Sequence, residues 1–189
     1  MKIEENTLIV GKEVKMKKLL VILSLFMVFM FGYGSTLDVN VEKGAKVPNF
    51  ELKDFRAQKV KSRKFFNSSK PTLFVVAAEW CPDCHEELPA VQKFYDENKD
   101  RVNVVVVFIS NRSSLLDARK FVESNKYTFP VFYDFDKSIV NGFKVKGVPF
   151  NLKIRKSVIE DISEGTMTLE GLNEMFNPSR VIVPSEIWL

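Results

Sequence analysis

The two cysteines of this 189-residue chain, Cys81 and Cys84, are separated by two residues. They follow an apolar segment directly and open a segment with helical periodicity, so the first turn of a helix would bring their sulfur atoms within disulfide reach. At a helix N-terminus, unpaired backbone N–H groups and the helix dipole favour a thiolate over a thiol at Cys81. A thiolate attacks disulfides, and Cys84 is placed to resolve the mixed disulfide that forms. The spacing therefore predicts redox chemistry at this pair.

Three other interpretations compete for the same two cysteines. A structural disulfide is one, but such a small loop constrains the unfolded chain little. A zinc site would need more Cys or His ligands, and His85 is the only histidine. The string Cys81-Pro82-Asp83-Cys84-His85 also has the C-x-x-C-H form of c-type haem attachment. Its position between an apolar strand and an amphipathic helix of an alternating α/β chain disfavours haem, and we expect His85 at the exposed start of that helix.

Length and composition limit the classes of protein that remain. The length allows about one domain plus a short extra segment. Hydrophobic residues make up 46% of the chain, with only 8 Gly and 8 Pro, which excludes collagen-like and low-complexity sequences. The net charge of +4 is modest, and half of it comes from the first 34 residues, which hold five Lys and three Glu. Without a dense basic stripe, we expect no nucleic-acid partner.

The N-terminal part of the chain has the pattern of a targeting segment. Lys17 and Lys18 precede 19 residues without a charged side chain. This pattern predicts an apolar helix over residues 16–37 that is either a signal peptide or an uncleaved membrane anchor. Because the basic residues precede it, the rest of the chain is expected outside the cytoplasm. A charged leader does not belong before such a segment, so we expect translation to begin at Met16 and residues 1–15 to be a mis-assigned start.

The remaining sequence alternates between strand-like and helix-like segments, which predicts an α/β fold with a central mixed sheet flanked by helices. We expect a linker over residues 38–46, a domain over 47–177 and an apolar tail over 178–189. The inward side of the third expected helix is predicted to carry Leu115, Leu116, Ala118, Phe121 and Val122. The expected strands are 47–52, 72–78, 102–109, 130–133, 150–154 and 158–164, and the expected helices are 62–67, 82–98, 113–125, 137–143 and 168–176.

Several motifs in order resemble the thioredoxin superfamily, and within it the ResA/TlpA-like extracytoplasmic thiol–disulfide oxidoreductases. The segment VVAAEWCPDCHEELPAV is similar to the strand, turn and helix that carry the active site in that family. The resemblance covers residues 46–176 and implies a thioredoxin-like fold. The other matching motifs are Lys46-Val47-Pro48-Asn49-Phe50-Glu51-Leu52, Phe129-Pro130-Val131 followed by Asp134, and Gly147-Val148-Pro149.

The resemblance implies roles for individual residues. Cys81 would be the nucleophile and Cys84 the resolving thiol. Glu87 matches an acidic residue that exchanges protons with the buried thiol in the ResA-like reductases, and the alternative for Glu87 is a solvated helix carboxylate. Trp80 would shield the sulfur atoms and present an apolar contact surface. No cofactor is expected beyond the redox-active pair itself.

The same resemblance assigns a substrate-binding loop. Pro149 would follow a cis peptide bond and face the cysteines, and Val148 would offer its backbone N–H and C=O to an extended substrate peptide. Two positions depart from related patterns. Cytoplasmic thioredoxins carry a buried Asp six residues before the first cysteine, where this chain has Val75. The family often has an acid or Thr soon after the cis proline, whereas Phe150 and Asn151 follow here.

The sequence therefore predicts an extracytoplasmic enzyme that exchanges disulfides with protein substrates. Asp83 lies beside the expected thiolate and disfavours its charge, which favours the reducing direction. By resemblance, a membrane electron-donor protein would recharge the pair, and the N-terminal segment would contact the membrane. A disulfide-forming oxidase and a c-type haem electron carrier are the alternative functions.

Overall fold

A five-stranded sheet lies at the centre of the computed structural model, which describes residues 36–177. Its strand order is β5-β4-β3-β6-β7. β3 pairs in parallel with β4, and β4 with β5, whereas β6 pairs antiparallel with β3 and with β7. The sheet is therefore mixed, which confirms the predicted fold class. Its strands are β3 (Thr72–Ala77), β4 (Asn103–Ile109), β5 (Val131–Asp134), β6 (Phe150–Arg155) and β7 (Val158–Glu164).

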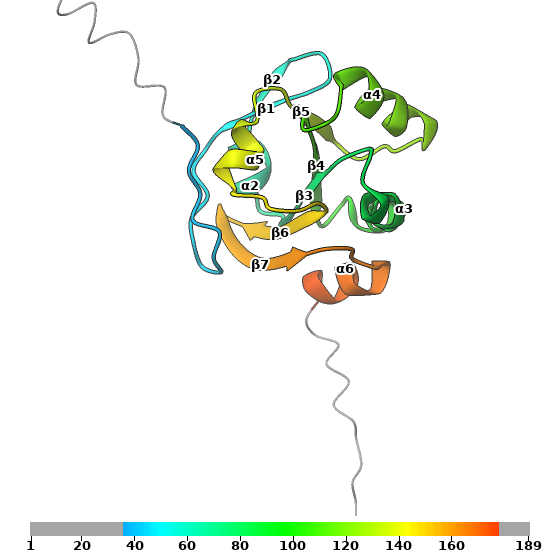
Figure 1. Ribbon diagram of the computed structural model, residues 1–189. Coiled ribbons are helices and arrows are strands. Elements are labelled where there is room, and N and C mark those ends of the chain that lie inside the picture. The colour runs from blue at the N-terminus through cyan, green and yellow to red at the C-terminus, as the bar shows by residue number, and fades with distance from the viewer. Residues whose placement is uncertain (1–35, 178–189) are drawn as a thin grey trace, which may run out of the picture. The chain divides into compact units, whose positions relative to one another are not determined.

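Helices cover both faces of this sheet (Figure 1). α3 and α4 connect successive parallel strands and lie on one face, where Phe94 of α3 also packs against Phe176 of α6. α2 and α5 lie on the other face. The helix that begins directly after Cys81 has the predicted bounds, and each of the other helices begins and ends within two residues of its predicted range. The helices are α2 (Arg63–Phe66), α3 (Pro82–Asn98), α4 (Leu115–Ser124), α5 (Ser138–Gly142) and α6 (Leu169–Phe176).

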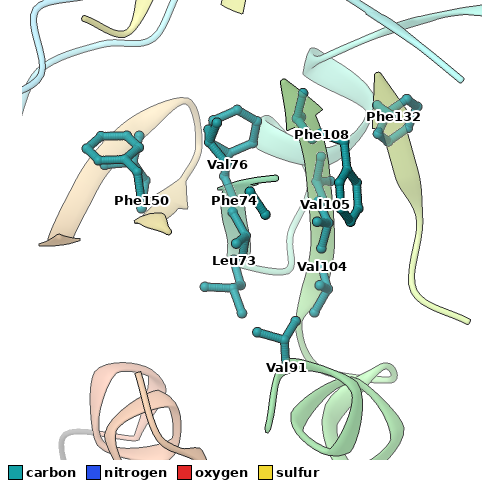
Figure 2. Packing of buried hydrophobic residues seen from close by; sticks show 14 of the residues in the cluster. Leu73, Phe74, Val76, Val91, Val104, Val105, Phe108, Phe132 and Phe150 are labelled. Carbon is teal, nitrogen blue, oxygen red and sulfur yellow. The ribbon is translucent and has the colours of Figure 1, made fainter. Parts of the chain in front are cut away.

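The two central strands are buried along almost their whole length. All six residues of β3 and six of the seven in β4 are shielded from solvent, because helices cover both faces. This explains why both read as continuous apolar runs rather than as alternating ones. Leu73 and Val104 are partners across the two strands, and Figure 2 shows Val91 of α3 pointing toward them. The core thus fixes α3, which carries Cys84 and begins directly after Cys81, against β3.

On the opposite face, three phenylalanines form a cluster around Phe74 of β3. Its ring centroid lies 5.4 Å from that of Phe66 in α2 and 5.0 Å from that of Phe143, which follows α5. Phe50 lies 5.7 Å from Phe66 and 5.5 Å from Phe143. Each such pair stabilises the fold by about 0.5–1.5 kcal/mol beyond the burial of its area. The cluster holds the chain after α5 against the sheet, and this chain continues into the loop before β6.

A small second sheet was not predicted in full. The strand expected over 47–52 is shorter and later, as β1 (Glu51–Lys53), and it pairs antiparallel with β2 (Lys59–Lys61). The Asp54 carboxylate accepts two backbone N–H groups of the connecting turn, each at 2.8 Å. β2 has only three residues and a lysine at each end, so it carries no alternation long enough to detect.

The inward face of α4 differs from the prediction at one position. Ala118 and Val122 are buried, and Leu115 and Phe121 pack partly against the core. Leu116 is instead 57% exposed, so its predicted inward position is wrong. Two residues along a helix correspond to a rotation of about 200°, which places Leu116 on the side opposite Ala118.

Residues 38–46, predicted as a linker, pack on the domain surface. Val39 is fully buried, and its N–H donates to the Gly142 carbonyl at 2.9 Å. Leu37 lies so close to Gly142 that a Cβ atom there would stand 2.5 Å from the Leu37 Cγ atom. Further along, the Gly44 N–H donates to the Ile159 carbonyl at 2.7 Å. The segment is polar in sequence, but Val39 is buried and Val41 and Ala45 are half-buried.

The other N- and C-terminal predictions lie outside the described residues. They are the leader over 1–15, the apolar helix over 16–37 except for its last two residues, and the tail over 178–189. Within residues 36–177, no helix combines the length and the hydropathy that a membrane-spanning segment needs.

Candidate redox site

Cys81 lies at the point where the chain leaves the sheet and enters α3. It is the N-cap residue, with extended backbone angles, and Pro82 follows as the first helical residue. Proline suits this position because its missing N–H would have no partner there. The Cys84 backbone N–H donates to the Cys81 sulfur at 3.3 Å. The cap is therefore a sulfur atom rather than the usual oxygen, and the helix N-terminus favours its negative charge.

The loop before β6 brings the predicted substrate-binding residues to Cys81. The Cys81 thiol donates to the Val148 carbonyl oxygen at 3.2 Å. The Val148–Pro149 peptide bond is cis, as predicted. Phe150, the first residue of β6, pairs with Val76 near the end of β3, which places this loop beside the start of α3. Val148 is half-buried, so part of this residue lies at the surface next to the sulfur.

Cys84 lies beneath Cys81 with no exposed area, and both cysteines are free. Burial raises the pKa of the Cys84 thiol far above its ordinary value, and the neighbouring Cys81 and the charge of Glu87 raise it further. Cys84 is thus held as a thiol. It can attack a disulfide only when a nearby group takes its proton.

Glu87 lies one helical turn after Cys84 and has no exposed area. This rules out the alternative of a solvated helix carboxylate. Its Oε2 atom accepts the Met167 backbone N–H at 2.8 Å and the Asn151 Nδ2 group at 3.2 Å. Burial raises the pKa of Glu87 from 4.5 to about 7, against the opposing effect of the two hydrogen bonds. The carboxyl group therefore gains and loses its proton near neutral pH.

Asn151 is a site residue that the sequence pattern did not assign. It lies within β6, opposite Val75 of β3, and its side chain is fully buried against Glu87. A polar residue in the middle of an otherwise apolar strand was the available signal, since a buried amide needs partners. In the sequence, Asn151 stood out only because the family often has an acid or Thr soon after the cis proline, where this chain has Phe150 and Asn151.

The loop between β4 and α4 fixes the residues that precede Cys81. The Trp80 Nε1–H group donates to the Asn111 carbonyl at 2.7 Å, and the Arg112 guanidinium lies 3.9 Å from the centre of the indole ring. The Ser113 hydroxyl donates to Glu79 Oε2 at 2.7 Å. Trp80 is half-buried, so one part of its ring packs on the domain while another faces solvent. Asn111 and Arg112 therefore fix the orientation of the Trp80 ring, which is the predicted apolar contact surface.

His85 is exposed at the start of α3, as expected. Its ring lies 4.6 Å from the Phe121 ring of α4, between centroids, and one ring nitrogen contacts the Glu79 carbonyl. Within the part of the chain that the structure describes, no group of three or more His, Cys, Asp or Glu side chains is arranged to hold a metal ion.

The fold and the cysteine pair at the start of α3 define a thioredoxin-like thiol–disulfide oxidoreductase. The chain belongs to the AhpC/TSA family, whose sequence model matches residues 43–165. That match includes both cysteines, Glu87, the cis proline and Asn151, whereas Met167, whose N–H binds Glu87, lies just beyond it.

Individual relatives agree with this assignment. The chain is 32% identical over 142 residues to thioredoxin-like protein YneN of Bacillus subtilis, covering 74% of this chain and 82% of that protein. It is 28% identical over 138 residues to the thiol-disulfide oxidoreductase ResA of Oceanobacillus iheyensis, covering 71% of each. The crystal structure of StoA from Bacillus subtilis superimposes with a TM-score of 0.60 at 28% identity, covering 67% of this chain and 95% of that one.

Proposed function

We propose that this protein reduces disulfide bonds in protein substrates outside the cytoplasm, through the Cys81–Cys84 pair. The observation that carries the proposal is the position of the Cys81 sulfur. It caps α3 and lies 3.2 Å from the carbonyl oxygen of the half-buried residue Val148, with Cys84 directly beneath it. A nucleophile, a resolving thiol and a site for an extended peptide thus meet at one point of the surface.

In the first step, the Cys81 thiolate attacks one sulfur of the substrate disulfide. A Cys81–substrate disulfide forms, and the other substrate sulfur leaves as a thiolate that takes a proton from solvent. The helix N-terminus stabilises the Cys81 thiolate before the attack. The Val148 backbone can bind the substrate segment as an added strand, and the exposed part of Trp80 offers it an apolar contact.

In the second step, Cys84 attacks the Cys81 sulfur of the mixed disulfide. The Cys84 proton passes to the Glu87 carboxylate, the Cys81–Cys84 disulfide forms, and the second substrate sulfur leaves. Two electrons have then moved from the cysteine pair to the substrate. Glu87 suits the role of proton acceptor because its pKa is about 7, which lets it hold and release a proton at neutral pH.

The reducing direction is supported by the charges near the nucleophile. Asp83 is exposed in the first turn of α3, two residues after Cys81, and a carboxylate there disfavours the thiolate. A dithiol form that is less stabilised is a stronger reductant. We further propose that the N-terminal segment is a signal or membrane anchor, and that a membrane electron-donor protein returns the oxidised pair to its dithiol form.

Trapping of the mixed disulfide tests the order of attack. In Cys84→Ser the resolving thiol is lost, so substrate proteins should stay bound to Cys81 and appear as adducts on non-reducing gels that disappear on reduction. Cys81→Ser is the matched control and should give no adducts. If Cys84→Ser gives none while its Cys81 still reacts with a small disulfide, the assigned order is wrong.

A further inference from the structure

Glu87 and Asn151 leave two buried oxygen atoms without a hydrogen-bond donor among residues 36–177. These atoms are Glu87 Oε1 and Asn151 Oδ1. The other Glu87 oxygen, Oε2, accepts two hydrogen bonds, one of which comes from the same Asn151 amide at 3.2 Å. A buried acceptor without a donor is costly, and two on neighbouring residues call for one explanation.

A single proton on Glu87 Oε1 accounts for both atoms. A carboxylic acid and a primary amide have matching donors and acceptors: the amide N–H group donates to one carboxyl oxygen, while the acid O–H group donates to the amide oxygen. The first of these two bonds is present. Protonation of Oε1 creates the donor for the second, and Asn151 Oδ1 is the free acceptor on the same amide.

We propose that Asn151 is a positioning residue that holds the Glu87 carboxyl group in both of its protonation states during the second redox step. In the ionised state, Asn151 Nδ2 stabilises the carboxylate through Oε2. In the protonated state, the same bond persists and Oδ1 accepts the new O–H. The proposal rests on the proposed function, because it assigns the proton that leaves Cys84 to a defined oxygen, Glu87 Oε1.

The place of Asn151 in the sheet suits this role. Its backbone lies between two strands, with Val75 of β3 as partner on one side and Ser163 of β7 on the other. Its Nδ2 group also donates to the Gly165 carbonyl at 3.4 Å. Because its backbone is held in a three-stranded ladder, the amide keeps its place when the carboxyl group gains or loses a proton.

Other charges near Glu87 are few. On its own helix, the titratable neighbours are Cys84 and, beyond it, Cys81, and the facing residues of β3 are uncharged. On β6, Lys153 lies two residues from Asn151, but its ammonium group bonds the Met175 carbonyl and pairs with Glu160.

The segment after β7 contributes a backbone group rather than a charge. This group is the Met167 N–H, while Glu164 and Glu170 on either side of it are exposed. Asn151 is thus the side chain whose substitution should change the protonation of the Glu87 carboxyl group.

The test compares Asn151→Leu with the wild-type protein. Leucine has the branched shape and the number of side-chain heavy atoms of asparagine but neither donates nor accepts, so the carboxylate loses its Asn151 bond. The ionised carboxylate loses a charge-assisted bond, which raises the Glu87 pKa, while the protonated acid loses the Oδ1 acceptor, which lowers it. The Glu87 carboxyl signal should therefore change in both protonation states, and the midpoint should move by less than one pH unit. Carbon-13 NMR of glutamate labelled at the side-chain carboxyl reads this midpoint directly. The pH profile of the step in which Cys84 releases the substrate should shift by the same amount.

The matched control is Asn98→Leu on the same helix. Asn98 is also buried and donates to a backbone carbonyl, that of Phe94 at 2.9 Å. It lies eleven residues beyond Glu87, about 16 Å along the helix. This substitution should lower stability and leave the Glu87 midpoint in place. In a Glu87→Gln background, Asn151→Leu should leave the pH profile of release unchanged.

A labelled Glu87 carboxyl signal that keeps its wild-type chemical shift in both protonation states in Asn151→Leu would overturn the inference, while exchange by the wild-type protein would still support the proposed function. Absence of exchange in the wild type would refute the proposed function itself. If Asn151→Leu does not fold, Asn151→Asp keeps the size and the acceptor but replaces the donor with a carboxyl group. The Glu87 midpoint should then rise, because two close acids share one proton. A midpoint that stays in place in Asn151→Asp also contradicts the inference.

Discussion

Replacing Glu87 with Gln should remove a pH dependence from the folding stability of the protein. In the folded state, burial raises the pKa of this carboxyl group from 4.5 to about 7. The folded protein therefore holds the Glu87 proton more tightly than the unfolded chain does. The stability that this proton supplies is fully present below pH 4.5 and is lost as the pH rises through about 7.

The size of this loss follows from the two pKa values. The difference between 4.5 and about 7, at about 1.4 kcal/mol per pH unit, corresponds to about 3 kcal/mol of unfolding free energy. Glutamine is neutral at every pH in this range, so Glu87→Gln should not show the loss. Above pH 7 the variant should gain about 3 kcal/mol on the wild type, relative to their difference at pH 4.5.

Urea unfolding of the dithiol proteins, repeated from pH 4.5 to 8, measures this difference. Other titrating groups affect both proteins equally, so the difference between the two profiles isolates Glu87. Glu86→Gln is the matched control, because Glu86 is the exposed neighbour on the same helix, and its profile should parallel that of the wild type. If the Glu87→Gln profile also runs parallel to the wild type, the buried and proton-binding character of Glu87 is refuted.

The remaining predictions concern the N-terminal segment and the contacts that hold the elements around the site. Removal of residues 1–34 should leave a soluble, folded domain that still unfolds cooperatively on heating, as followed by circular dichroism; loss of cooperative unfolding would mean that this segment belongs to the core. Gly142→Ala should lower the unfolding free energy by about 1–3 kcal/mol, because the added Cβ meets Leu37. The companion change Leu37→Ala should cancel most of that cost in a double-mutant cycle, and additive effects would contradict the contact. Lys153→Met should cost about 1–3 kcal/mol and speed amide exchange in α6, because the bond to the Met175 carbonyl is lost; unchanged exchange would show that this bond does not hold the helix.

The parts of the site that could be predicted from sequence are those with local causes. Cys81 caps α3 because a proline and a helical period follow it directly, and the apolar run before it becomes a central strand. The cis bond before Pro149 and the position of Val148 beside Cys81 came from a resemblance to a family. Neither follows from spacing alone, since 67 residues separate Val148 from Cys81.

The parts that could not be predicted depend on contacts between distant segments. Whether Glu87 is buried is decided by Asn151 of β6 and the Met167 backbone, 64 and 80 residues further on. Periodicity on α3 alone left a solvated carboxylate equally open. In the same way, Val39 is buried in a segment that looks like a linker, because Gly142 leaves room for the chain to approach α5.

The reduction potential of the Cys81–Cys84 pair decides whether this account of the protein holds. It can be measured by equilibrating the protein with thiol–disulfide buffers and counting the free thiols by alkylation and mass spectrometry. We predict one reversible two-electron transition, absent from Cys81→Ser, with a potential nearer to the roughly −270 mV of thioredoxin than to the roughly −120 mV of DsbA. A potential near that of DsbA would contradict the reducing direction, and the absence of any reversible transition would contradict the redox site itself.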